Sequence, residues 1–318
     1  MVEVVIPGEI LVEIMRTEKD VAFTEVGLFR GPYPSGAPAI CADAIARLGG
    51  SVGMIGVVGD DDFGRVVVDR LRNDGVNVSH IRVAEGYTTG TAFVMYRRDG
   101  SRKFIFHLRH AAAGQLSPED INEDYVASAR WLHLMGSAIS VSESSMEACY
   151  RALEIAAENG LRISLDPNLR PELLGVERIR EILRPVLDEA YLVLPSGEEV
   201  KMITDASSPE DACRELINRG VKIVALKRGE KGSRVYTEEE VIDVPSIRVE
   251  EVDPTGAGDT YDGAFIYGLL KGWDIRDVAL FANVAGALSV TKFGPMEGCP
   301  FRGDVEKRLK EVRSQAPL

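Results

Sequence analysis

The stretch VDPTGAGDTYDGAF, residues 252–265, decides the fold. Gly256, Ala257 and Gly258 come directly before Asp259, and an apolar run follows them. Small residues let the backbone approach a ligand, and the first N–H groups of a helix attract anions, so the pattern predicts an anion-binding loop leading into a helix from about Asp259. It is neither a Walker A loop, because no lysine follows the glycines, nor a dinucleotide fingerprint, because Tyr261 replaces the third glycine.

Asp259 has two interpretations in this setting. Aspartate is a frequent N-cap, so the carboxylate can simply satisfy the first amides of the helix. Alternatively, a carboxylate beside a bound phosphoryl group can accept the proton of an attacking hydroxyl, and phosphoryl transfer needs little more than such positioning. The spacing alone leaves both interpretations open.

The chain that leads to this stretch alternates strand and helix from about Gly114 onward. RWLHLMG (130–136), RISLDPN (162–168), YLVLPS (191–196) and KIVALKRG (222–229) read as strands, and amphipathic helical segments separate them. Such alternation predicts a three-layer α/β/α fold with a mostly parallel sheet and an active site at the carboxyl ends of its strands.

Two earlier segments differ from this alternation. Residues 20–36 and 88–109 are rich in strand formers, and Arg98, Asp99 and Gly100 mark a hairpin turn. Neither segment has enough apolar surface to fold alone. We therefore predict one α/β domain over residues 1–318, with a small β-sheet lid formed from about 12–34 and 88–110.

Composition excludes several classes of function. The net charge of −13 argues against nucleic-acid and anionic-membrane partners, and the four scattered cysteines form no zinc or disulfide pattern. No apolar run is long enough to span a membrane. Glu3, Glu9 and Glu13 interrupt the N-terminal apolar run, which indicates a first strand rather than a signal peptide and predicts a cytoplasmic location.

The sequence resembles the ribokinase-like (PfkB) carbohydrate kinases. The family signature is similar to DPTGAGDTYDGAF, and collinear blocks extend over nearly the whole chain, among them GEILVEIM (8–15), SGAPAICADAIARLGG (35–50), DPNLRPELL (166–174) and FANVAGALSV (281–290). The resemblance is greatest to the branch of fructokinases and 2-keto-3-deoxygluconate kinases. It implies ATP-dependent phosphorylation of a hydroxyl on a small sugar or keto-sugar acid, by a single kinase domain with a ribokinase-like fold.

The resemblance also implies roles for residues around the signature. Asp259 would be the general base, and the backbone of Gly256, Ala257 and Gly258 would form the anion hole. ATP and Mg²⁺ are the expected cofactors, with a monovalent cation such as K⁺ in many members. The implied nucleotide contacts are Ser196, Lys227, Gly229, Gly232 and Asn283, while Glu199 would hold magnesium through water. Ser196 replaces the asparagine that is usual in the family.

Substrate contacts are implied on the lid and on nearby loops. The residues concerned are Glu13, Gly36, Ala37, Ile40, His107, Arg109 and Arg170. Arg170 suits a substrate carboxylate because a guanidinium can bind one with two hydrogen bonds. Ser35 and Ile40 replace a usual glycine and asparagine, and Glu13 replaces a usual aspartate, so the identity of the sugar stays open. Strand alternation places the side chains of His107 and Arg109 on the same face of one strand. Solvent exposure of that face explains these polar residues more simply than contact with a substrate does.

Two alternatives to a sugar kinase remain. Phe23, Phe29 and Tyr33 in the first lid segment would suit base stacking in a nucleoside kinase. A non-catalytic sensor of sugar or nucleotide on the same fold would not need Asp259. The apolar residues of the lid segment also predict a homodimer that pairs through the lid, as in similar kinases.

Overall fold

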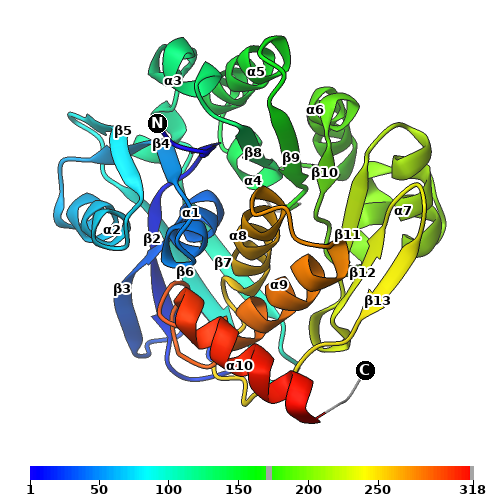
Figure 1. Ribbon diagram of the computed structural model, residues 1–318. Coiled ribbons are helices and arrows are strands. Elements are labelled where there is room, and N and C mark those ends of the chain that lie inside the picture. The colour runs from blue at the N-terminus through cyan, green and yellow to red at the C-terminus, as the bar shows by residue number, and fades with distance from the viewer. Residues whose placement is uncertain (170–173, 316–318) are drawn as a thin grey trace.

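The computed structural model describes residues 1–169 and 174–315, which form a large sheet and a smaller one (Figure 1). Within the described residues, the large sheet has nine strands. Their spatial order is β13 (Val241–Val244), β12 (Ser233–Tyr236), β11 (Ile223–Lys227), β10 (Leu192–Val193), β9 (Arg162–Asp166), β8 (Trp131–Met135), β1 (Val4–Pro7), β4 (Val52–Gly59) and β5 (Asn77–Ala84). All neighbours from β11 to β5 are parallel, and β12 and β13 add an antiparallel edge.

Helices cover both faces of the large sheet. The first core lies under α1 (Ala37–Arg47), α2 (Asp62–Asn73), α8 (Ala257–Leu270), α9 (Ile275–Ser289) and α10 (Arg302–Gln315). The second lies under α3 (Glu123–Ala127), α4 (Gly136–Ile139), α5 (Glu143–Glu158), α6 (Val176–Glu189) and α7 (Pro209–Asn218). Strand residues divide alternately between them: Val4 and Ile6 enter the first core, and Val5 enters the second. The predicted three-layer fold is confirmed.

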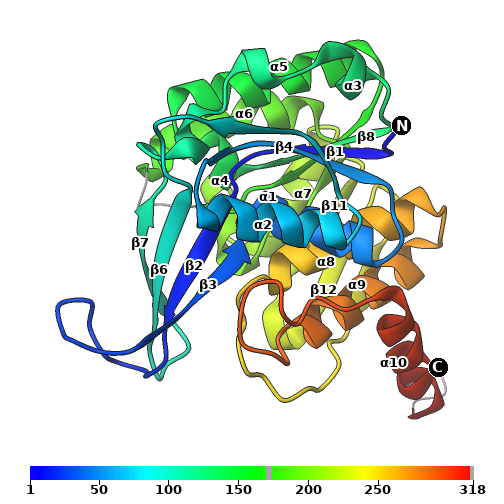
Figure 2. The same cartoon turned by 90° about the vertical axis from the view of Figure 1, so that its left-hand side faces the viewer.

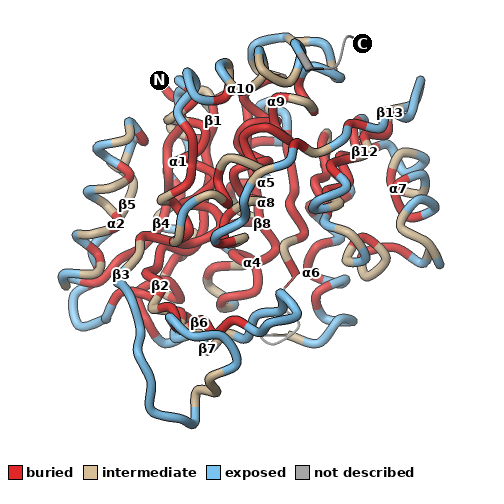
Figure 3. Tube along the Cα trace, turned by 90° about the horizontal axis from the view of Figure 1, so that it is seen from below, coloured by how far each residue is buried: buried red, intermediate tan, exposed pale blue. Residues whose placement is uncertain are grey.

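The two ends of α5 follow from local chemistry. The side chain of Ser142 accepts a hydrogen bond from the amide of Ser145 and so starts α5, and Gly160 adopts a positive φ of 68° just after it. Every residue of β4 and of β11 is buried, as expected for parallel strands covered on both faces (Figure 3).

The smaller sheet, here called the lid sheet, extends away from the large one (Figure 2). Its order is β3 (Phe29–Ser35), β2 (Leu11–Arg16), β6 (Gly90–Tyr96) and β7 (Arg102–His107). β6 and β7 form the hairpin predicted around Asp99, and β2 joins the two segments by pairing parallel to β6 and antiparallel to β3. The lid sheet thus takes β3, β6 and β7 from the two segments that differ from the strand–helix alternation, and β2 from the chain that precedes the first of them.

Short 3₁₀ helices complete the chain at Ala112–Gln115, Pro118–Asp120, Gly197–Ile203 (η3) and Gly229–Lys231 (η4). Among the helices of the described residues, none combines the length and apolarity that a membrane crossing requires.

Candidate active site

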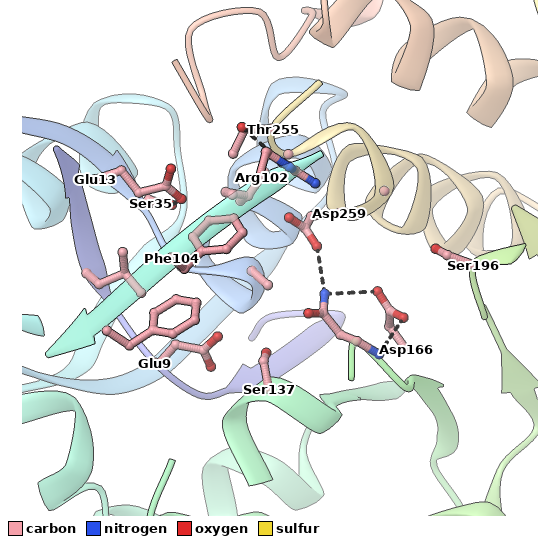
Figure 4. Close-up of a pocket in the computed structure, with 18 of the residues that line it drawn as sticks. Glu9, Glu13, Ser35, Arg102, Phe104, Ser137, Asp166, Ser196, Thr255 and Asp259 are labelled. Atoms are coloured by element: carbon pink, nitrogen blue, oxygen red, sulfur yellow. Dashed lines mark hydrogen bonds between the residues drawn. The ribbon is translucent and has the colours of Figure 1, made fainter. Parts of the chain in front are cut away.

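A cavity of about 270 Å³ opens where the carboxyl ends of the large sheet face the lid sheet (Figure 4). The N-terminus of α8 and the ends of β9 and β11 form one side, and β2, β3 and β7 form the other. Its lining includes these residues named from the sequence: Glu13, Gly36, Ala37, Ile40, Ser196, Glu199, Lys227, Gly256, Gly258 and Asp259. This is the edge at which parallel sheets place their active sites.

The signature loop is held in one conformation by backbone geometry. Gly256 has a φ of 80° and is the N-cap of α8, and a Cβ at this position would lie 2.4 Å from the carbonyl oxygen of Pro295. Only glycine meets both conditions. The helix that follows is buried continuously from Asp259 to Gly268, so its first turn is fixed with respect to the core. Amides at a helix N-terminus with this dipole suit a phosphoryl group.

Asp259 lies in the first turn of α8 rather than before it. The predicted start near Asp259 is two residues late, because the helix begins at Ala257, and the N-cap interpretation of Asp259 is wrong, because Gly256 is the N-cap. The Asp259 side chain is nearly buried, and the side-chain amide of Asn168 donates to its Oδ1 at 3.2 Å. Its carboxylate is thus oriented into the cavity beside the N-terminus of α8 (Figure 4).

Asn168 is a site residue that the sequence did not reveal. It follows β9 with a left-handed φ of 38°, and its side-chain amide also lies 3.3 Å from Oδ2 of Asp166. Asp166 accepts the backbone amide of Asn168 as well, at 3.1 Å. Asn168 therefore connects the end of β9 with Asp259, which is 91 residues away in the chain.

Lys227 ends β11 and is buried between carboxylates. Its Nζ donates to Asp166 Oδ2 at 3.1 Å and to the two oxygens of Asp262 at 2.9 and 3.0 Å. Burial opposes the positive charge, but the carboxylates of Asp166 and Asp262 outweigh it and hold the pKa of Lys227 above its ordinary value.

Ser196 and Glu199 face each other at the start of η3. The amide of Ser196 donates to Glu199 Oε1 at 2.5 Å, and the amide of Leu169 donates to Oε2 at 3.4 Å. Burial, with the charge of Asp166 added to it, raises the pKa of Glu199 to about 7. Carboxylate oxygens at the cavity wall are of the type that bind Mg²⁺ directly or accept hydrogen bonds from its bound waters.

The opposite end of the cavity is polar and acidic. Ser35 donates to Glu13 Oε1 at 2.7 Å, and both side chains lie on the lid sheet, while Glu9 lines the cavity beside Ser137 (Figure 4). Gly36 has a φ of 113°, and a Cβ on it would lie 2.5 Å from the carbonyl oxygen of Glu9. Buried carboxylates and a hydroxyl at this end can accept hydrogen bonds from the hydroxyls of a sugar.

The face of β7 that lines the cavity is the opposite of the face predicted from the sequence. Arg102, Phe104 and Phe106 line the cavity, and the two rings stack with centroids 5.2 Å apart. His107 is exposed and contacts Phe93 on the outer face of the lid sheet, while Arg109 lines a separate, smaller pocket beside α5. The structure therefore does not bring His107 and Arg109 to the cavity.

The other residues that the resemblance assigns to nucleotide binding form a second group around the turn after β11. Gly229 and Gly232 have φ values of 56° and 80°, and a Cβ on Gly232 would lie 2.2 Å from the carbonyl oxygen of Val244. The Asn283 side chain donates to that same oxygen at 3.0 Å. These three residues do not line the cavity; Gly232 and Asn283 instead meet at the end of β13. Arg170 lies outside the described residues.

The fold and cavity define a class of protein: an α/β domain whose polar cavity lies between a helix N-terminus, which suits an anionic group, and a β-sheet lid. Small-molecule kinases have this organisation, and the comparisons with known proteins agree with it. A model of the pfkB family of carbohydrate kinases matches residues 4–302. The chain belongs to the PfkB family and is a sugar kinase.

Individual relatives refine this assignment. Fructokinase-1 from Zea mays is 34% identical over 314 residues, which cover 96% of this chain and 97% of the relative. An E. coli protein described as a "putative ribokinase II", crystallised with ATP and Mg²⁺, is 41% identical with a TM-score of 0.92, covering 98% of this chain and all of that one. A Vibrio cholerae fructokinase with bound fructose, ADP and potassium is 28% identical with a TM-score of 0.85, covering 96% and 98%.

Proposed function

We propose that the protein transfers the terminal phosphoryl group of ATP to a primary hydroxyl of a small sugar. The observation that carries this proposal is that one cavity holds Asp259, the N-terminus of α8 and the polar pair Glu13–Ser35. An acceptor bound at Glu13 and Ser35 can thus reach the carboxylate and the anion-binding amides together. ATP and Mg²⁺ in the E. coli relative support the choice of donor.

Asp259 takes the acceptor proton in this scheme while the oxygen attacks phosphorus. The amides at Gly256 to Gly258 hold the migrating group, and charge stabilisation and positioning provide most of the rate enhancement. Mg²⁺, when bound with ATP, would neutralise charge on the phosphates, and Glu199 is the residue we assign to its bound water. A monovalent cation such as K⁺, which backbone carbonyl oxygens coordinate, would lie near the signature loop, where the carbonyl oxygen of Pro295 approaches Gly256.

The acidic end of the cavity favours an uncharged acceptor such as a ketohexose. Glu9 and Glu13 both line the cavity as buried carboxyl groups, whose oxygens can accept hydrogen bonds from sugar hydroxyls, whereas a substrate carboxylate has no proton to donate to them. A keto-sugar acid would need a cation to pair with its own carboxylate, and Arg170 or the cavity-lining Arg102 would provide it. Arg170→Ala should therefore weaken the binding of a keto-sugar acid, measured as its KM, more than the binding of fructose, and equal losses would exclude a carboxylate-binding role.

A nucleoside kinase is the second candidate, favoured by the aromatic wall of Phe104 and Phe106. Stacked rings of this kind can hold a flat base. Phe23, Phe29 and Tyr33, which suggested base stacking from the sequence, are not part of the cavity lining. Phe29 packs between Phe23 and Phe93 on the outer face of the lid sheet, and Tyr33 contacts Phe293.

A screen of ADP release tests the proposal. Purified protein with ATP and Mg²⁺ is offered ketohexoses, aldohexoses, 2-keto-3-deoxygluconate, inositol and nucleosides, and release without acceptor is subtracted. We expect the highest kcat/KM with a ketohexose. Preference for a nucleoside would support the second candidate, and no acceptor-dependent release with any of them would favour a non-catalytic sensor.

The outer face of the lid sheet suits a homodimer. Phe29, Phe93 and Ile105 lie together on it, and Leu28 beside them is 70% exposed. Contiguous apolar surface of this kind marks an interaction site. We therefore infer pairing through the lid and expect a dimer by sedimentation at micromolar concentration. Ile105→Asp should yield monomers; a monomeric wild type at the same concentration would contradict the inference.

A further inference from the structure

Three carboxylates gather behind the anion-binding loop, and one lysine lies among them. One carboxylate oxygen from each of Asp166, Asp259 and Asp262 lies within 4.8 Å of the other two, and all three residues are buried. Carboxylates this close cannot all be ionised without a compensating cation. The ammonium of Lys227 supplies the charge from within the chain, through its contacts with Asp166 and Asp262.

The contacts of Lys227 continue as far as Asp259. Lys227 holds Asp166, Asp166 accepts the backbone amide of Asn168, and the side-chain amide of Asn168 donates to Asp259. The three hydrogen bonds measure 3.1, 3.1 and 3.2 Å, and each has a charged partner, which strengthens it relative to a neutral hydrogen bond. A displacement at Lys227 is therefore transmitted to the carboxylate that faces the acceptor.

Lys227 also lies beside the first turn of α8. A Cβ built on Gly258 would be 3.5 Å from the lysine Nζ. The ammonium thus adds positive charge next to the amides that are expected to receive the phosphoryl group. Because Asp262 occupies the same helix one turn later, the lysine binds both the sheet edge and the helix that together form the site.

We propose that Lys227 is a positioning residue for phosphoryl transfer, which balances the charge of the Asp166–Asp259–Asp262 cluster and orients Asp259 through Asp166 and Asn168. This role differs from the nucleotide contact that the resemblance implies for the turn beginning at Lys227. It rests on the proposed function, since it needs Asp259 to act on an acceptor hydroxyl.

The test compares charge-changing and charge-balanced variants in the full chain. Lys227→Met removes the ammonium but keeps an unbranched side chain as far as the ε position, and Lys227→Met/Asp262→Asn removes one charge of each sign. Lys222→Met is the matched control, an exposed lysine at the other end of β11. Turnover and acceptor KM are measured with the best acceptor of the screen at saturating ATP.

Lys227→Met should lower kcat on the order of 100-fold, the loss typical of a misplaced reacting group, with acceptor KM within about threefold. The double variant should regain at least about tenfold in kcat, because the charge of the cluster is again balanced, and Lys222→Met should match the wild type. A kcat for Lys227→Met within threefold of the wild type would overturn the proposal. So would a folded double variant no faster than Lys227→Met.

If Lys227→Met does not fold, the double variant decides alone. A kcat about three- to tenfold below the wild type, with unchanged acceptor KM, supports the proposal, because the charge is balanced but the contact with Asp166 is lost. A kcat within threefold of the wild type, as a merely structural lysine would give, overturns it, and so does a loss greater than tenfold. These outcomes stay separate from the proposed function, because they are read only against an active wild type. A wild type that phosphorylates no acceptor would instead refute the proposed function.

Discussion

Gly256 and Gly258 lie two residues apart in the signature loop, yet the same substitution to alanine should affect them in opposite ways. At Gly256 the backbone is left-handed, which costs an alanine roughly 1–2 kcal/mol. The new Cβ would also lie 2.4 Å from the carbonyl oxygen of Pro295 and 3.3 Å from Ile40. Overpacking of this kind adds about 1–3 kcal/mol, so the free energy of unfolding should fall by roughly 2–5 kcal/mol.

The clash at Gly256 also has a consequence for turnover. The loop and Pro295 must separate by roughly 0.6–1 Å to reach an ordinary contact distance, which displaces the amides of the anion hole. Misplacement on this scale costs on the order of 100-fold in rate. Gly256→Ala should therefore lower both the melting temperature, by about 4–10 °C, and kcat.

Gly258 provides the control for stability. It lies inside α8, and a Cβ there meets nothing closer than the Nζ of Lys227 at 3.5 Å, which is ordinary contact. Since alanine is the better helix former by about 1 kcal/mol, Gly258→Ala should melt no lower than the wild type. Differential scanning fluorimetry and the ADP-release assay measure both effects. A Gly256→Ala variant with unchanged melting temperature and unchanged kcat would refute the reasoning.

Three further variants test other parts of the site. Asn168→Ala should lower kcat by roughly 10-fold or more, because a hydrogen bond to a charged group is worth about 1.5–3 kcal/mol, whereas Asn73→Ala on the surface of α2 should not; equal rates would contradict the orienting role. Phe104→Ala should raise acceptor KM and leave ATP KM unchanged, and a selective loss of ATP binding would place the ring at the nucleotide instead. Glu199 keeps its proton in the folded state up to about pH 7 and releases it near pH 4.5 when unfolded, so its contribution to stability falls as pH rises through this window. The melting temperature of Glu199→Gln minus that of the wild type should therefore increase from about pH 5 to pH 7, and a constant difference would argue against the raised pKa.

Local patterns predicted the features that local chemistry determines. The small residues of the signature loop predicted a loop that leads into a helix, and strand–helix alternation predicted the sheet edge at which the cavity lies. The phase of β7 was not predictable in this way, because alternation divides a strand into two faces without saying which one is buried. Its two phenylalanines, Phe104 and Phe106, were the available signal for the face that lines the cavity.

The contacts that orient Asp259 were not predictable because they join distant parts of the chain. Asn168 reaches Asp259 only because the backbone turns into a left-handed conformation after β9. Lys227 meets Asp262 across 35 residues, once β11 and α8 have packed together. The N-cap interpretation of Asp259 was wrong because Gly256, with its positive φ, starts the helix earlier.

Turnover of Asp259→Asn tests the central claim most directly. Asparagine keeps the size of the side chain and still has an oxygen that can accept the hydrogen bond from Asn168, but it cannot take the acceptor proton. With the best acceptor and saturating ATP, kcat should fall by about 100- to 10,000-fold, with acceptor KM within about threefold of the wild type. An exposed aspartate, Asp188→Asn on α6, serves as the control and should retain full turnover. Full turnover of Asp259→Asn itself would contradict the assignment of Asp259 as the base.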